Sequence, residues 1–141
     1  MIIAITGSVA TGKTTIAKIL AKKLNAKYID VSKLVKNGKF LSKYMKKFDT
    51  YEVDLTKLNK LLIKIIEKSK RNLIIDSHLS HYLPAKYVNY CIVCKCDISI
   101  LKKRLKSRKY SNLKIRENLD SEIFDVCLVE SLENKHKVIV V

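Results

Sequence analysis

The stretch "GSVATGKTT", residues 7–15, combines residue types that bind phosphate groups. Gly7 and Gly12 are two of only three glycines in the 141-residue chain. Lys13 and Thr14 follow the second glycine directly, which fits the pattern G-x-x-x-x-G-K-S/T. The glycines of this pattern let backbone N–H groups approach phosphate oxygens, the lysine bridges the β- and γ-phosphates, and the hydroxyl binds Mg²⁺. We therefore predict a phosphate-binding loop at the start of a helix.

A second candidate element is "LIIDSH", residues 73–78, in which Asp76 follows an apolar run. An acid at the end of a strand helps to place Mg²⁺ in nucleotide-binding proteins, and open α/β sheets bind ligands where strands end. His78 stands two residues further on, so in an extended segment both side chains point to the same side. Asp76 could instead be a helix N-cap or turn residue, and His78 an ordinary loop histidine with a pKa of about 6.5.

The third element is "LKKRLKSRKY", residues 101–110, which predicts a basic helix. Arg104 and Arg108 are four residues apart, so a helix places both guanidinium groups on one face. Arg108 stands where this helix gives way to a polar hinge, and an arginine there can close over phosphates during their transfer. The alternative is a solvated basic helix end that the helix dipole favours.

The pattern of apolar residues predicts strands that alternate with helices. The predicted strands are 1–6, 27–31, 72–76, 89–96 and 137–141, and the predicted helices are 12–24, 55–69, 98–108 and 113–132. Residues 32–54 are mixed, basic and aromatic, and no regular element is predicted for them. Such alternation predicts an α/β fold with a parallel sheet and helices on both faces. The phosphate-binding loop then lies between the first strand and the first helix, as its pattern requires.

Composition limits the class of protein. Apolar residues make up 48% of the chain and charged residues 30%, which is typical of one globular domain. The apolar runs are too short to cross a membrane, and residues 1–9 lack the features of a signal peptide, so we expect a cytoplasmic protein without membrane contact. Disulfides are rare in that compartment, so we predict that the cysteines are small buried hydrophobic residues and not metal ligands. The cysteines are Cys91, Cys94, Cys96 and Cys127.

The chain is strongly basic. It has 29 lysines and arginines against 13 acidic residues, a formal net charge of +16. Such a surface favours a polyanionic partner such as RNA. A lysine-rich composition can also reflect genome bias or growth at high temperature. Charge alone leaves both explanations open.

In this order, these elements resemble the nucleoside monophosphate kinases, and most of all the small archaeal and nuclear adenylate kinases (isoenzyme 6, the coilin-interacting nuclear ATPase family). The segments that carry the resemblance are "GSVATGKTT", "KYIDVSKL", "LIIDSHLSHYLP", "DISILKKRLKSRKYS" and "ENLDSEIFDVCLVES", which span most of the chain. The resemblance implies a single P-loop NTPase domain over residues 1–141 with a five-stranded parallel sheet. It also implies a short monophosphate-binding segment at about 29–53 and a short lid at about 107–117.

The family's site residues carry over onto this sequence by motif. The resemblance assigns the family's phosphate-binding positions to Ala10, Gly12, Lys13, Thr14 and Thr15 of this sequence. Arg108 resembles the lid arginine that contacts ATP, and Asp76 and His78 resemble the Walker B pair. The resemblance therefore gives Lys13, Asp76, His78 and Arg108 as catalytic residues. It gives Thr14 and Asp76 as Mg²⁺ ligands, the second directly or through water.

The resemblance implies phosphoryl exchange between ATP and AMP with Mg²⁺, an ATPase activity, and a role in small ribosomal subunit and rRNA maturation. Its partners would be AMP as acceptor, a small-subunit ribosomal protein and rRNA, and the protein would be a monomer or weak dimer. Transfer to AMP needs no catalytic base, because the acceptor is a phosphate oxygen with a second pKa of about 6. Water must be deprotonated, and His78 could serve as the base.

The sequence departs from the family in several places. Ala10 stands where glycine is frequent, and Asp30 where asparagine is frequent. The basic segment 36–54 does not allow the AMP contacts to be transferred. Relatives usually add a final helix after the position of Val141, so we expect either that one face of the sheet is incompletely covered or that this tail is missing here. Two other functions stay open: a kinase of a small hydroxylated acceptor with Asp30 as base, and a ribosome-assembly ATPase with incidental kinase activity.

Overall fold

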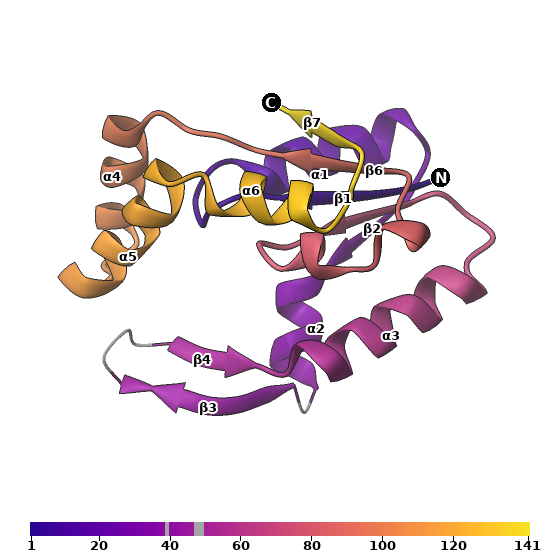
Figure 1. The fold of residues 1–141 in the computed structure, drawn as a ribbon, viewed down its shortest axis with the longest axis horizontal. Helices are drawn as coiled ribbons and strands as arrows, with labels where there is room; N and C mark the ends of the chain where they lie inside the picture. Colours follow the sequence, from indigo (N-terminus) through magenta and orange to yellow (C-terminus); the bar gives the residue numbers. More distant parts are fainter. Residues whose placement is uncertain (39, 47–49) are drawn as a thin grey trace.

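The computed structural model describes residues 1–38, 40–46 and 50–141. In this part of the chain, a five-stranded sheet forms the centre of the molecule (Figure 1). Its strands, in spatial order, are β2 (Lys27–Asp30), β5 (Leu73–Asp76), β1 (Ile2–Thr6), β6 (Tyr90–Val93) and β7 (Val138–Val140). All neighbouring pairs are parallel, which confirms the predicted fold class. The carboxyl ends of the strands therefore lie at one edge, and the loops that follow β1 and β5 meet there.

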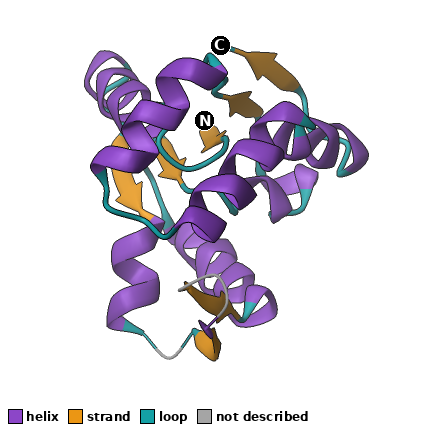
Figure 2. Cartoon of the chain, turned by 90° about the vertical axis from the view of Figure 1, so that its left-hand side faces the viewer, coloured by secondary structure: helices purple, strands orange, loops and turns teal. Residues whose placement is uncertain are grey.

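Helices cover both faces of the sheet, as the view in Figure 2 shows. On one face, Ile3 and Ile5 pack against buried alanines of α1 (Lys13–Lys23). On the other face, Ala4 packs with buried leucines of α3 (Leu55–Lys68), because successive strand residues point to opposite sides. The other helices are α2 (Val31–Asn37), α4 (Ile98–Ser107), α5 (Asn112–Ile123) and α6 (Val126–Glu133), with short 3-10 turns at Ser80–Tyr82 and Ala85–Tyr87.

The sequence predicts no regular element for the segment 32–54, but its described residues contain a helix and a hairpin. The helix is α2, and Asp30 caps it by accepting a hydrogen bond from the backbone N–H of Lys33 (3.3 Å). The strands β3 (Leu41–Met45) and β4 (Thr50–Val53) form an antiparallel hairpin separate from the main sheet (Figure 1). Within the expected monophosphate-binding segment, residues 39 and 47–49 lie outside the described residues.

The predicted helix over 113–132 is wrong, because the structure has two helices there, α5 and α6. They separate at Asp125, whose φ of 52° lies in the left-handed region, and α6 begins directly after it. Aspartate tolerates this conformation better than most residues. The Asp125 carboxylate also pairs with the ammonium of Lys95. The break lets α6 fold back onto the sheet, where it contacts β6 and β7.

The cysteines follow the prediction for the most part. Cys91, Cys94 and Cys127 are buried in the interior as free thiols, and burial raises the pKa of Cys91 and Cys94 to about 11. Cys96 is also a free thiol but is only half-buried. Among the described residues, no helix has the length and apolar character needed to cross a membrane.

Candidate phosphoryl-transfer site

The phosphate-binding loop lies between β1 and α1, as predicted. Gly7 and Gly12 have φ angles of 142° and 94°, which favour glycine. A Cβ at residue 7 would lie 2.5 Å from the carbonyl oxygen of Cys94, so the loop can pass β6 this closely only without a side chain. Ala10 also has a positive φ, 68°, a conformation that costs a residue with a side chain about 1–2 kcal/mol. This geometry explains why glycine suits position 10.

The loop presents donors to a bound anion. Gly12 is the N-cap of α1, and because glycine has no side chain it cannot cap the first amide groups of this helix, which suit an anion. The ammonium of Lys13 donates to the carbonyl oxygen of Ser8 (2.8 Å). Burial in the cavity wall lowers the pKa of Lys13, Asp76 opposes this shift, and Arg108 adds to it. A phosphate group beside Lys13 would favour the charged ammonium.

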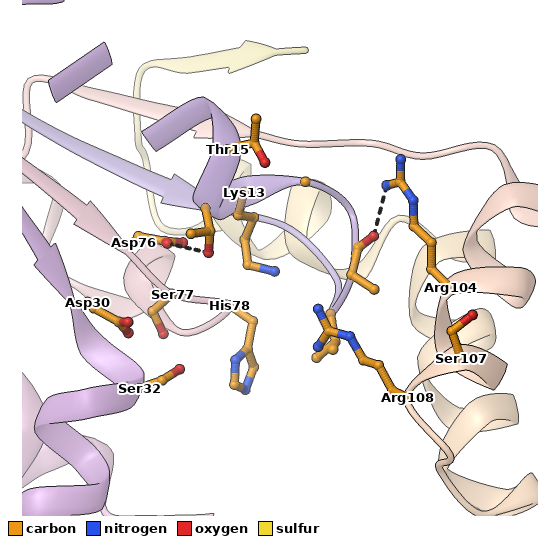
Figure 3. Close-up of a pocket in the computed structure, with 14 residues that line it drawn as sticks. Lys13, Thr15, Asp30, Ser32, Asp76, Ser77, His78, Arg104, Ser107 and Arg108 are labelled. Carbon is orange, nitrogen blue, oxygen red and sulfur yellow. Dashed lines mark hydrogen bonds between the residues drawn. The ribbon is translucent and has the colours of Figure 1, made fainter. Parts of the chain in front are cut away.

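A cavity of about 610 Å³ opens in front of the loop (Figure 3). It brings together every residue that the sequence predicts for the site: Ala10, Gly12, Lys13, Thr14, Thr15, Asp76, His78 and Arg108. Sequence reasoning missed Ser32 and Ser77, which also line it. The structure therefore places the predicted residues around one space, and their individual roles stay predictions.

Asp76 lies at the end of β5, where two hydroxyl groups bind it. Its Oδ2 atom accepts hydrogen bonds from Thr14 Oγ1 (2.8 Å) and from the Tyr28 hydroxyl (2.7 Å). Tyr28 comes from β2, and sequence reasoning missed it because its partner lies 48 positions away. The donor set of Thr14 and Asp76 fits Mg²⁺, which takes oxygen ligands, usually one or two carboxylates together with phosphates and water.

His78 extends from the loop after β5 into the cavity, between Ser32 and Arg108 in Figure 3. Crowding of the imidazole by the protein, with smaller contributions from Lys13 and His81, lowers the pKa of His78 to about 4. The residue still has an exposed surface in the open cavity, which limits this shift, but its direction leaves the imidazole neutral at pH 7. The pKa of His78 is thus lower than the ordinary histidine value that is expected from the sequence alone.

Arg104 and Arg108 both line the cavity from α4, as their spacing predicts. The Arg104 guanidinium donates to the carbonyl oxygen of Ala10 (3.0 Å), so it holds the phosphate-binding loop. Arg108 is the C-cap of α4, and its guanidinium donates to the Tyr110 hydroxyl (3.3 Å). In Figure 3 the Arg108 side chain points toward the space in front of Lys13.

A second cavity, of about 590 Å³, lies beside the first. The two share Val9, Ser32, Ser77, His78 and Arg108, which therefore stand at their boundary. Aliphatic side chains form much of its wall, among them Val31, Val35, Leu41, Val53 and Leu79. Its polar residues include Lys36 from α2 and Lys114, Glu117 and Asn118 from α5. The sequence does not reveal this cavity, because its walls come from α2, the hairpin and α5.

Comparisons with known proteins agree with this architecture. Residues 3–125 match the family described as AAA domain. A relative from Methanocaldococcus jannaschii, named "Putative adenylate kinase", is 44% identical over 131 residues, which are 93% of this chain and 72% of the relative. A relative of the same name from Pyrococcus furiosus is 40% identical over 139 residues, covering 99% of this chain and 73% of the relative.

Solved structures share the fold at low sequence identity. A deoxyadenosine kinase from M. mycoides with bound dATP has a TM-score of 0.65 at 17% identity, over 100% of this chain and 90% of that chain. A shikimate kinase from Bacteroides thetaiotaomicron has a TM-score of 0.59 at 17% identity, over 99% of this chain and 85% of that chain.

The fold, the phosphate-binding loop and these matches define a P-loop kinase of the nucleoside monophosphate kinase type. Within that class, the chain belongs to the archaeal adenylate kinase family that its relatives represent.

Proposed function

We propose that this protein transfers the γ-phosphoryl group of ATP to AMP and so forms two molecules of ADP. The observation that carries the proposal is the pair of adjoining cavities that share His78 and Arg108. One cavity is lined by the phosphate-binding loop, and the other has the apolar walls that suit a nucleotide base. The name of the archaeal relatives supports adenine nucleotides as the substrates.

The first cavity would hold ATP. Its phosphates would lie against the amide groups of the loop and the Lys13 ammonium, whose distance to Ser8 O shows that it reaches across the loop. Thr14 and Asp76 would bind Mg²⁺, which screens phosphate charge when bound. Arg104 holds Ala10 in place through its carbonyl oxygen, which keeps the loop in its binding conformation.

The second cavity would hold AMP. Its volume of about 590 Å³ lies within the range of small-molecule sites, ~300–1,000 Å³. Its valines and leucines suit the adenine base of AMP, and Lys36, Lys114 and Arg108 suit the AMP phosphate. We propose that α2 and the hairpin form the monophosphate-binding segment at 29–53. The lid at 107–117 would then be the turn after α4 with the first turns of α5.

The reaction then needs alignment and charge screening more than proton transfer. The AMP phosphate is mostly ionised at neutral pH, so its oxygen can attack the γ-phosphorus of ATP without a base. Arg108 stands at the boundary of the two cavities, where its charge offsets the repulsion between two anionic substrates. The ADP leaving group stays at the loop amides and Lys13, which stabilise its developing negative charge.

We also propose a slower ATP hydrolysis when AMP is absent. The neutral imidazole of His78 at the cavity boundary can accept a proton from water, although its lowered pKa makes it a weak base.

We propose in addition that the basic surface, with a net charge of +16, contacts RNA. The ribosomal partners and a location in the cytoplasm are what the family resemblance implies.

A kinase of a hydroxylated acceptor is the second candidate, because Asp30 lines the ATP cavity. Its Oδ1 atom already accepts the hydrogen bond from the Lys33 amide that caps α2. A base for a hydroxyl group needs a carboxylate within hydrogen-bond reach of the acceptor. This capping role of Asp30 favours the AMP reaction over the alternative.

Phosphorus NMR tests the proposal, because it follows phosphoryl transfer and hydrolysis in the same sample. ATP and Mg²⁺ are mixed, in separate samples, with AMP, with other nucleoside monophosphates, with a panel of nucleosides and small alcohols, or with no acceptor. We expect rapid formation of two ADP molecules per ATP with AMP, and only slow release of inorganic phosphate without acceptor. Phosphorylation of an alcohol that is faster than phosphorylation of any monophosphate would establish the second candidate instead.

A further inference from the structure

In the described part of the chain, the buried carboxylates belong to Asp76 and Glu122. Asp76 lines the ATP cavity, whereas Glu122 lines neither of the two cavities above. Glu122 lies near the end of α5 and is 5% exposed. Burial of a carboxylate away from solvent is costly unless donors surround it, so its contacts indicate what it is for.

The donors come mainly from the link between β6 and α4. Glu122 Oε1 pairs with the ammonium of Lys95 (2.8 Å), and Oε2 accepts a hydrogen bond from the backbone N–H of Cys96 (2.6 Å). Lys95 also donates to the backbone oxygen of Glu122 (3.0 Å). Both carboxylate oxygens thus fix residues 95 and 96 against the end of α5.

The same link supports the phosphate-binding loop. Gly7 passes so close to the carbonyl oxygen of Cys94 that no Cβ would fit, so the loop packs directly against the residue before Lys95. The buried Ser8 hydroxyl lies 3.4 Å from Glu122 Oε1 and 3.3 Å from the Ser121 hydroxyl. The Ser8 carbonyl oxygen in turn accepts the Lys13 ammonium. Glu122 is therefore two contacts away from the ammonium that would meet the phosphates of ATP.

We propose that Glu122 is a positioning residue that holds the phosphate-binding loop in its nucleotide-binding conformation, through Ser8 and through the β6–α4 link. This inference rests on the proposed ATP site for its effect on affinity. It also ties the loop to α5, the helix whose first turns belong to the proposed lid. Loop and lid would thus share one rigid support.

A purely structural ion pair would stabilise the fold without affecting the loop, so the test must separate the two roles. Hydrogen–deuterium exchange of the amides of residues 8–12 is measured without nucleotide. ATP affinity is measured by calorimetry with Mg²⁺ and no acceptor. The variants are Glu122→Gln, Lys95→Met and Ser8→Ala. The controls are Leu62→Ala, which removes a buried side chain from α3, and Glu133→Gln, which removes an exposed carboxylate from α6.

We expect about tenfold faster exchange at residues 8–12 and about tenfold weaker ATP binding in Glu122→Gln, with smaller changes of the same kind in Ser8→Ala. If Glu122→Gln changes both quantities no more than Leu62→Ala does, Glu122 only stabilises the fold and the proposal is wrong. If Glu122→Gln does not fold, Lys95→Met and Ser8→Ala decide by the same criterion. Should the unchanged protein bind no ATP, the proposed function fails, while the exchange data still decide the role of Glu122.

Discussion

Asp76 and Glu122 have similar side chains, are both buried, and lie close to the same loop, yet their surroundings differ. Asp76 accepts hydrogen bonds from neutral hydroxyl groups, of Thr14 and Tyr28, and lines a cavity. Glu122 is paired with the Lys95 ammonium and a backbone N–H and lines neither cavity. The donors to Asp76 are neutral, whereas the charge of Glu122 is paired with an ammonium group. This difference is the reason why we propose Asp76 as a Mg²⁺ ligand and Glu122 as a support for the loop.

The largest effect on activity should come from Lys13, which lines the cavity in front of the phosphate-binding loop. Lys13→Ala should lower the rate of ADP formation by ~10³–10⁵, the range of charged groups that stabilise a transferring phosphoryl group. Its thermal unfolding should stay cooperative and close to that of the unchanged protein. The matched control is Lys22→Ala, an exposed lysine of the same helix, which should keep full activity. More than about a tenth of the activity in Lys13→Ala would reject the site.

Asp76→Asn tests the cavity side of the comparison directly. It keeps the shape of the side chain but removes the charge that would hold Mg²⁺, so both phosphoryl transfer to AMP and hydrolysis should fall at least a hundredfold. Rates are measured over a range of Mg²⁺ concentrations. If Asp76→Asn and Glu122→Gln have equal effects on turnover at saturating Mg²⁺, the distinction between the two carboxylates is wrong.

Arg108→Ala should lower kcat and kcat/KM by about a hundredfold, with little change in the affinity for ATP. The reason is the position of Arg108 at the end of α4, where its contact with phosphate should form mainly when the lid closes. Steady-state kinetics and ATP titration are compared on the same preparation. A rise in the KM for ATP alone would show that Arg108 only binds ground-state phosphate.

His78→Ala should lower ATP hydrolysis about a hundredfold, at the low end of general-base effects, and leave transfer to AMP nearly unchanged. Because burial lowers the pKa of His78 below its ordinary value, the imidazole stays neutral to a lower pH than that of a free histidine. The kcat/KM of hydrolysis should therefore stay level as pH falls through 6.5 and decline only at lower pH, unlike that of a histidine with an ordinary pKa. Equal losses in both reactions would assign His78 to a role shared by the two paths.

The smallest effect should come from Tyr28→Phe, which removes only the hydroxyl that donates to Asp76 Oδ2. Loss of one such hydrogen bond should raise the Mg²⁺ concentration for half-maximal rate about three- to tenfold. The maximal rate at saturating Mg²⁺ should change little, since Thr14 still binds Asp76. The comparison variant is Tyr87→Phe, on the 3-10 turn Ala85–Tyr87, which should behave like the unchanged protein.

Much of the fold could be predicted from local sequence. The strands and the helices over 12–24, 55–69 and 98–108 follow from apolar spacing, which local structure obeys. The segment 32–54 could not be predicted in this way, because α2 has only seven residues and β3 has no clear alternation of apolar and polar residues. The break at Asp125 was missed because its helical pattern continues on both sides, while tertiary contacts with Lys95 and the sheet decide the turn.

The sequence by itself determined the phosphate-binding loop, because glycines, lysine and threonine must stand at fixed spacing for their backbone and side chains to meet one phosphate chain. It also determined that a strand ends at Asp76, because an apolar run precedes this residue. Only the tertiary structure decided what those residues contact. The strand order β2-β5-β1-β6-β7 sets β2 beside β5 and so brings Tyr28 to Asp76, 48 positions away. The packing of the end of α5 against the link after β6 brings Glu122 to Lys95, 27 positions away. Such contacts depend on the packing of whole elements, which no local pattern of residues contains.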